Sequence, residues 1–285
     1  MIELMNSPLI LSLVFPALCV LGIVPLLRWA VSGEKRDVYA SFSLALACLI
    51  ACVCAYGRPG EAFQFGVAAL TYALGVSSFL SLFTTLWVTN NFLRFCFVLI
   101  NLLLTCWILV GMPMELDMLV KALWAGYILL VMAGVAILRT RWELNTDSYA
   151  IGPFISLLVV AATLGLISFW VGDGTSVNFA VALCVICMAS LIWTIRKFGF
   201  RYQENALLPL SLCVAVLMWD LWLQGHLNLV SVVLLLASLF SRSAVIKVLS
   251  SAPNWMQKGY YVFILGFSIL PAFLSVVFFD ILRNL

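Results

Sequence analysis

Charged residues are scarce in this chain of 285 residues, because Asp, Glu, Lys and Arg together make up 9%, against 65% hydrophobic residues. Soluble globular domains carry about 25% charged residues, and water does not tolerate so large an apolar surface. The longest polar stretch, residues 139–152, is too short to bury a core of its own. The sequence therefore argues against a soluble protein and predicts an all-α integral membrane protein, with one polytopic domain over residues 1–285.

Histidine is nearly absent, since His226 is the only one and falls in a predicted loop. Haem ligation by paired histidines within the chain, a zinc protease site and a serine protease triad all need histidines that are missing here. The sequence also has no paired acidic motif for Mg²⁺ and no Walker or dinucleotide-binding loop. We therefore expect no enzymatic activity, no metal and no cofactor.

The nine cysteines favour packing over chemistry. Cys184 and Cys187 have the C-x-x-C spacing of redox and zinc motifs, but they lie in the middle of an apolar run without a second pair. The other six of the eight cysteines that fall inside apolar runs have no motif partner at all, and cysteines in such runs act as small hydrophobes. The eight are Cys48, Cys52, Cys54, Cys96, Cys106, Cys184, Cys187 and Cys213.

Long apolar runs predict about ten membrane-spanning helices, nine being the alternative count. A spanning helix needs about 20 predominantly apolar residues, and the runs are too continuously apolar for barrel strands. Spans three and four are divided only by Val88–Asn91, which predicts a tight hairpin, a re-entrant segment being the alternative. The ten predicted spans are residues 8–31, 38–56, 65–87, 93–112, 118–138, 153–172, 178–196, 206–224, 227–247 and 260–282.

The distribution of Lys and Arg predicts the orientation of the chain. Twelve basic residues follow odd-numbered spans, whereas the opposite side holds only Arg58, Lys121 and Arg283. Because basic loops favour the cytoplasm, both termini are predicted to be non-cytoplasmic. Short loops favour a bacterial inner membrane.

The ten spans divide into possible halves, residues 1–145 and 146–285, on either side of the polar loop. Five helices per half would make the halves inverted repeats, a plan that many secondary transporters use. Pro8 and Pro153 open the two halves with similar segments. Span two carries small residues four apart, which fits helix packing or a sliding seam: Ser43, Ala47, Ala51 and Ala55.

Ionisable groups at membrane depth are candidates for function because they are costly there. Asp220 and Lys121 lie about one turn inside the outer ends of spans eight and five, so an ion pair between them is possible by depth. Asp117 competes as a partner for Lys121, because it lies four residues earlier on the same helix. The alternative is that Asp220 and Lys121 are solvated among the lipid headgroups.

Arg28 and Asn101 complete the four substrate-path candidates. Arg28 lies near the inner end of span one, where snorkelling to the interface is the favoured interpretation. Asn101 and Thr105 share a face of span four and could bond to Ser77, Ser78 or Ser81 in span three. Such bonds usually hold helices together, and a path for a polar solute is the alternative.

Three functions fit these features. The first is a transporter or flippase for a small solute or a lipid-linked substrate, and the second is a non-catalytic membrane subunit that assembles or anchors a larger complex. The third is an intramembrane enzyme with unusual residues. The expected partners are the lipid bilayer and other membrane proteins. The basic residues are too dispersed for nucleic acid.

Overall fold

The computed structural model describes residues 8–33, 36–57, 69–88, 90–110, 151–195, 204–239 and 272–278, with single residues and short pieces within 126–137, 198–202 and at 270. Throughout these residues the regular structure is helical. Six segments are long and apolar enough to cross a membrane: Ile10–Ala30, Arg36–Tyr56, Leu70–Trp87, Phe92–Leu109, Gly152–Val171 and Gly174–Trp193. The prediction of a multi-pass α-helical membrane protein is thereby confirmed.

The described helices follow the predicted spans closely. They are α2 (Pro8–Ala30), α3 (Arg36–Ser41), α4 (Ser43–Tyr56), α5 (Leu70–Trp87), α6 (Asn91–Leu109), α8 (Ile151–Val171), α9 (Gly174–Trp193), η3 (Glu204–Leu207), α10 (Leu208–Leu223) and α11 (Leu229–Ser238). Of predicted span five the structure describes only short pieces within 126–137, and most of span ten and the last eight residues of span nine lie outside the described residues. Ten spans and an inverted repeat therefore stay predictions.

Two boundaries differ from the sequence-based expectation for local reasons. Predicted span two is divided into α3 and α4 at Phe42. Helix α9 begins four residues before the predicted start at 178, because Asp173 accepts hydrogen bonds from the backbone N–H groups of Thr175 and Ser176.

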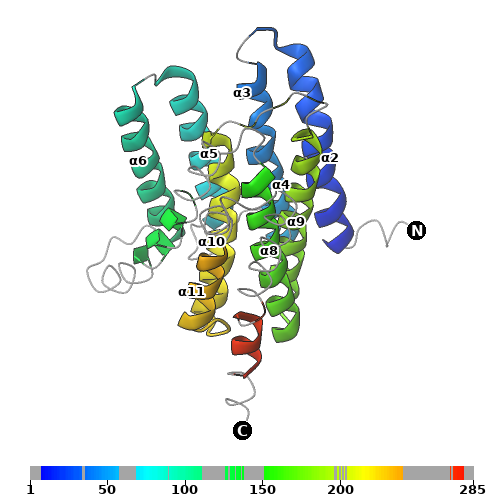
Figure 1. The fold of residues 1–285 in the computed structure, drawn as a ribbon, viewed down its shortest axis with the longest axis vertical. Helices are drawn as coiled ribbons and strands as arrows, with labels where there is room; N and C mark the ends of the chain where they lie inside the picture. The colour runs from blue at the N-terminus through cyan, green and yellow to red at the C-terminus, as the bar shows by residue number, and fades with distance from the viewer. Residues whose placement is uncertain are drawn as a thin grey trace, which may run out of the picture.

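Helices α2, α4, α8, α9 and α10 form the central bundle, and α5 and α6 form a hairpin at its side (Figure 1). The upper end of the bundle is defined here by the α2–α3 and α5–α6 connections, and the lower end by the α8–α9 and α10–α11 connections (Figure 1). The two described connections that follow odd-numbered predicted spans, α2–α3 and α5–α6, thus lie at the same end of the bundle.

The α5–α6 turn shows how a short polar hinge reverses the chain. Asn90 caps α6 by accepting a hydrogen bond from the backbone N–H of Phe92 at 2.9 Å. The Arg94 side chain folds back, and its Nε donates to the Val88 carbonyl at 2.6 Å. Carbonyl and amide groups that the two helix ends leave unpaired are satisfied in this way, which supports the predicted helical hairpin.

Small side chains allow the bundle helices to approach closely. A Cβ atom placed on Gly165 of α8 would lie 3.1 Å from the Cβ of Ala180 on α9. On α4, the predicted face of small residues is turned inward, since Ser43, Ala47 and Ala51 are buried. Every residue of α10 from Leu208 to Trp219 is buried as well, so α10 is the central helix of the described bundle.

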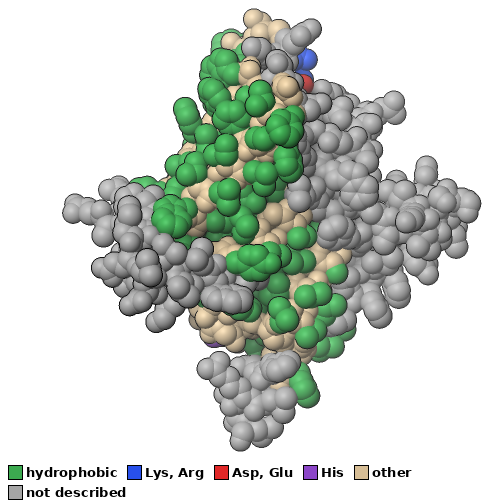
Figure 2. Space-filling model, turned by 90° about the vertical axis from the view of Figure 1, so that its left-hand side faces the viewer, with side chains coloured by type: hydrophobic (Ala, Val, Ile, Leu, Met, Phe, Trp, Pro, Cys, Tyr) green, Lys and Arg blue, Asp and Glu red, His purple; other side chains and the backbone are tan. Residues whose placement is uncertain are grey.

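Large apolar side chains cover the outside of the molecule. Figure 2 shows hydrophobic side chains over most of the described surface on the side of α6, with charged side chains only near its upper end. The exposed set on α6 includes Phe92, Phe95, Leu99, Leu103 and Trp107. Water would not support such a surface, whereas the hydrocarbon of a bilayer does.

Candidate functional site

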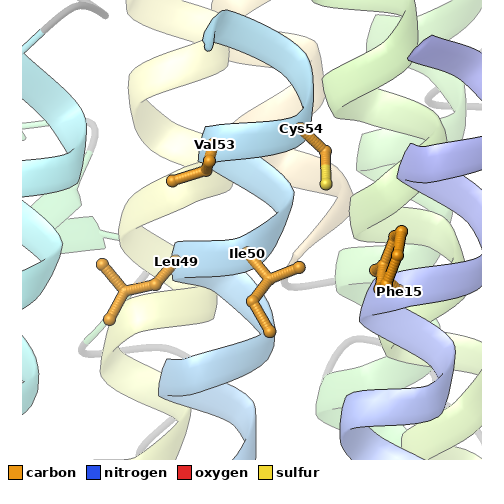
Figure 3. Close-up of a pocket in the computed structure, with 5 residues that line it drawn as sticks. All are labelled: Phe15, Leu49, Ile50, Val53 and Cys54. Atoms are coloured by element: carbon orange, nitrogen blue, oxygen red, sulfur yellow. The ribbon is translucent and has the colours of Figure 1, made fainter. Parts of the chain in front are cut away.

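An apolar recess of about 360 Å³ lies on the outer surface between α2 and α4. Phe15 of α2 forms one side, and α4 supplies the remaining lining, from Leu49, Ile50, Val53 and Cys54 (Figure 3). All five side chains lack nitrogen and oxygen, so the recess offers no hydrogen bond from its lining side chains. It can accommodate only an apolar group.

The two faces of α4 differ in the size of their side chains, and the face with large side chains forms most of the recess. Leu46, Leu49, Ile50 and Val53 follow the spacing of one helical face, and Leu46 and Val53 are 41% and 38% exposed. The opposite, small-residue face packs inward, where the Cys19 thiol of α2 contacts the carbonyl of Ser43 at 4.0 Å. The small residues thus serve helix packing, while Leu49, Ile50 and Val53 line the recess and Leu46 lies outside it.

Asp173 lies at the lower end of the bundle, in the connection between α8 and α9. Its Oδ1 accepts hydrogen bonds from the hydroxyl of Thr175 at 2.6 Å and from the backbone N–H groups of Thr175 at 3.1 Å and Ser176 at 3.3 Å. Partial burial raises the pKa of Asp173, but the interactions with Ser176 and Thr175 outweigh burial and leave it below its usual value. Asp173 is therefore a charged cap on the positive end of α9.

Asp220 of α10 lies within electrostatic range of Asp173 at this lower end, and two hydroxyl groups lie nearby. Its carboxylate accepts a hydrogen bond from Gln224 at 2.9 Å. The hydroxyl of Tyr56, at the end of α4, lies within electrostatic range of both carboxylates, and the Ser176 hydroxyl lies beside Tyr56 and Asp173. Both hydroxyls are buried, and neither has the geometry of a hydrogen bond to a described residue. We call Tyr56, Asp173, Ser176 and Asp220 the lower-end cluster.

Arg28 lies at the opposite, upper end, and its side chain is only 18% exposed. Its Nε forms an ion pair with Asp37 of α3 at 2.9 Å, and its Nη1 donates to the carbonyl of Phe198 at 3.0 Å. The guanidinium also lies 5.4 Å from the ring centre of Phe200. Instead of extending freely to the interface, Arg28 joins α2, α3 and the segment after α9.

Asn101 forms the predicted bonds between α5 and α6. Its Nδ2 donates to the Ser77 carbonyl at 3.1 Å and to the Ser81 hydroxyl at 3.3 Å. The Thr105 hydroxyl donates to both the backbone carbonyl and the Oδ1 of Asn101. All these residues are buried, so the interpretation as a contact that holds two helices together is supported.

The structure does not bring the four predicted candidates together. Asp220, Asn101 and Arg28 lie on α10, α6 and α2 and have different partners, while Lys121 and Asp117 lie outside the described residues. Sequence reasoning missed Tyr56 and treated Asp173 only as part of a turn. The signal for Asp173 was present, because an Asp just before the start of an apolar run, here followed by Gly174, Thr175 and Ser176, is typical of a helix cap.

The cysteines lie in helices, as the sequence pattern predicts. All nine cysteines are free thiols in helices, most of them buried. The Cys184 thiol donates to the Leu158 carbonyl of α8 at 3.8 Å, which fits helix packing. No group of three or more metal-binding side chains converges among the described residues.

Comparison of the chain with protein-family models, with curated proteins and with solved structures finds no match.

Proposed function

We propose that this chain is a transporter or flippase for an apolar or lipid-linked substrate in a bacterial inner membrane. The observation that supports it is the recess between α2 and α4, which opens on the lipid-facing surface and has a wholly apolar lining. Its volume falls within the range of about 300–1,000 Å³ that is usual for small-molecule sites. A substrate reaches such a recess from the hydrocarbon of the bilayer, because the lining offers nothing to a hydrated solute.

The polar side chains at membrane depth favour a lipid-soluble substrate over a polar one. Asn101 uses its amide nitrogen and oxygen in contacts between α5 and α6. Arg28 is paired with Asp37 and bonded to a carbonyl group. Neither side chain is free to line a path for a polar solute, so the apolar recess is the better supported substrate site.

The proposed architecture is ten spans in two inverted halves, residues 1–145 and 146–285, with both termini outside the cytoplasm. Inverted halves provide alternating access by the rocking of one half against the other. The recess contacts only α2 and α4, both in the first half, so this half carries the proposed apolar site.

Reconstitution into liposomes tests the proposal. The purified chain should accelerate the exchange of fluorescent lipids between leaflets, measured as the fraction that dithionite quenches from outside. Val53→Trp fills the recess and should slow exchange at least tenfold. Leu46→Trp is the matched control, since Leu46 is similarly exposed on α4 but lies outside the recess. Equal rates in liposomes with and without protein, or an unaffected Val53→Trp variant, would contradict the proposal.

A non-catalytic membrane subunit is the second candidate, supported by the broad exposed apolar face of α6. Aromatic side chains such as Phe95 and Trp107 are typical anchors in protein contacts. In this case a stoichiometric partner should remain bound to the tagged chain in mild detergent, and Phe95→Ala should release it. Leu18→Ala on the exposed face of α2 is the control and should retain the partner.

A further inference from the structure

The lower-end cluster combines two carboxylates with two buried hydroxyl groups, and no lysine or arginine side chain lies among them in the described part of the chain. Arg28, Arg36 and Arg94 are the described arginines, and all three lie at the upper end, whereas His226 lies at the lower end in the α10–α11 connection. The described charges are thus separated: acidic at the lower end, apart from Asp37 at the upper one. The lower end therefore attracts cations.

The negative charge of Asp220 is less well compensated than that of Asp173. Asp173 caps the N-terminus of α9, where the positive end of the helix dipole and two backbone N–H groups stabilise its charge. Asp220 lies three residues before the C-terminus of α10, where the helix dipole is negative, and its one described hydrogen bond comes from Gln224. A half-buried carboxylate in this position is stabilised by a bound cation.

Two neighbouring buried hydroxyls point to a ligand at this place. Ser176 is completely buried, and its Oγ makes no hydrogen bond of good geometry with the described residues. The same holds for the Tyr56 hydroxyl of α4, which neighbours Ser176 and lies within electrostatic range of both carboxylates. A buried hydroxyl normally has a partner, and an ammonium group has three N–H donors, which can serve up to three of these four acceptor groups.

The apolar recess lies close to the lower-end cluster along the axis of α4. Val53 and Cys54 line the recess, and Tyr56 follows them by three and two residues, which is about 3–5 Å along the helix axis. We propose that the lower-end cluster binds the ammonium head group of an amphiphilic substrate whose apolar chain occupies the recess. The inference deepens the proposed function and depends on it for the apolar chain.

Binding of dodecylamine to the full chain in phosphatidylcholine nanodiscs tests the assignment, with empty nanodiscs subtracted. The chain should bind dodecylamine at least tenfold more tightly than dodecanol, which has the same chain without a positive charge. Equal affinity for the two probes would overturn the proposal without any variant. The proposal would also be overturned if sodium chloride stabilised the chain and ethylammonium chloride did not, because the site would then select a metal ion.

Three variants locate the site. Asp220→Asn should lower dodecylamine affinity at least tenfold and leave dodecanol binding unchanged. Tyr56→Phe should lower it to a smaller extent, because only a hydrogen bond is lost. Val53→Trp should weaken both probes, since it fills the recess. Unchanged dodecylamine affinity in Asp220→Asn would overturn the assignment.

The two proposals can fail separately. If the chain binds dodecylamine through Asp220 but moves no lipid in liposomes, the proposed transport is wrong and the ammonium site stands. If it moves neutral and amine-bearing lipids at equal rates, and binds dodecylamine and dodecanol equally, transport stands and the ammonium site is wrong.

Discussion

At the scale of single residues, the polar side chains of this protein connect segments that are distant in sequence. Arg28 bonds to Phe198, and Tyr56 lies beside Ser176. In an environment without water, each unpaired polar group is costly, so such residues contribute to stability in proportion to the partners they find. Asp173 and Arg28 offer the clearest tests, because their described partners are well defined.

Replacing Asp173 by Ala should lower the free energy of unfolding by about 1 kcal/mol, because loss of a helix cap typically costs this much. Asp173→Asn should lose much less, since the amide oxygen still accepts from the backbone N–H groups of residues 175 and 176. Reversible unfolding in mixed detergent micelles measures both values. An equal loss in the two variants would show that charge, rather than capping, stabilises this end of α9.

The lowered pKa of Asp173 predicts an acid-dependent loss of stability. A carboxyl group whose folded pKa lies below its unfolded value, about 3.9, contributes full stability above that value. The contribution is lost as pH falls through the lower folded pKa. The difference in melting temperature between the wild type and Asp173→Asn, followed from pH 7 to pH 3 in detergent, should therefore shrink below about pH 4. A constant difference would contradict the expectation.

Arg28 and Asp37 should show a measurable coupling energy. The pair is mostly buried, and residues in such contact couple by about 0.5–3 kcal/mol. A double-mutant cycle with Arg28→Ala and Asp37→Ala measures this coupling as unfolding free energy. Arg28→Lys should restore only part of the loss, because one ammonium group cannot serve Asp37, the Phe198 carbonyl and the Phe200 ring together.

Arg36 provides the control for this cycle. It also lies near Asp37, at 3.7 Å, but its side chain is 52% exposed. Exposed ion pairs contribute little, so Arg36→Ala should leave stability nearly unchanged. A loss equal to that of Arg28→Ala would show that the net charge of this end, rather than the buried geometry, is responsible.

At the scale of helices, α8 and α9 approach closely because a glycine faces an alanine. Gly165→Leu should lower the free energy of unfolding by about 1–3 kcal/mol, since overpacking forces the two helices apart. Gly75→Leu on α5 is the matched control, because a Cβ there meets nothing within 4 Å. Melting temperatures of the two variants in detergent make the comparison, and equal values would show that the contact between Gly165 and Ala180 is not limiting.

The success of sequence reasoning at this scale follows from the physics of helices in lipid. A continuous apolar run must satisfy its own backbone, so the described helices could be predicted from composition and turn residues alone. The Asn101 contacts were predictable as well, because residues four apart share a face. The recess was not, since it depends on how Phe15 of α2 faces α4, and a one-dimensional pattern carries no such information.

For the molecule as a whole, the lower-end cluster shows the same limit of prediction from sequence. Asp220 could be found by its depth in an apolar run, but Tyr56 and Asp173 reach it only through the packing of α4 and α9 beside α10. Helix lengths and loop charges predict that these residues lie at one end of the molecule, but they do not predict which of them are neighbours. Contacts between distant segments need the three-dimensional arrangement.

The orientation of the whole molecule can be tested at its two ends. If the upper end is cytoplasmic, as the distribution of basic residues predicts, a cysteine at exposed Ser32 should be protected from a membrane-impermeant thiol reagent in intact cells. A cysteine at exposed Gly174, at the lower end, should react. The native thiols lie in the helices, and the unmodified chain measures their background. The reverse labelling would place the ammonium site on the cytoplasmic side, where it would receive substrate from the inner leaflet. The expected labelling instead opens both the recess and the carboxylates to lipids of the outer leaflet.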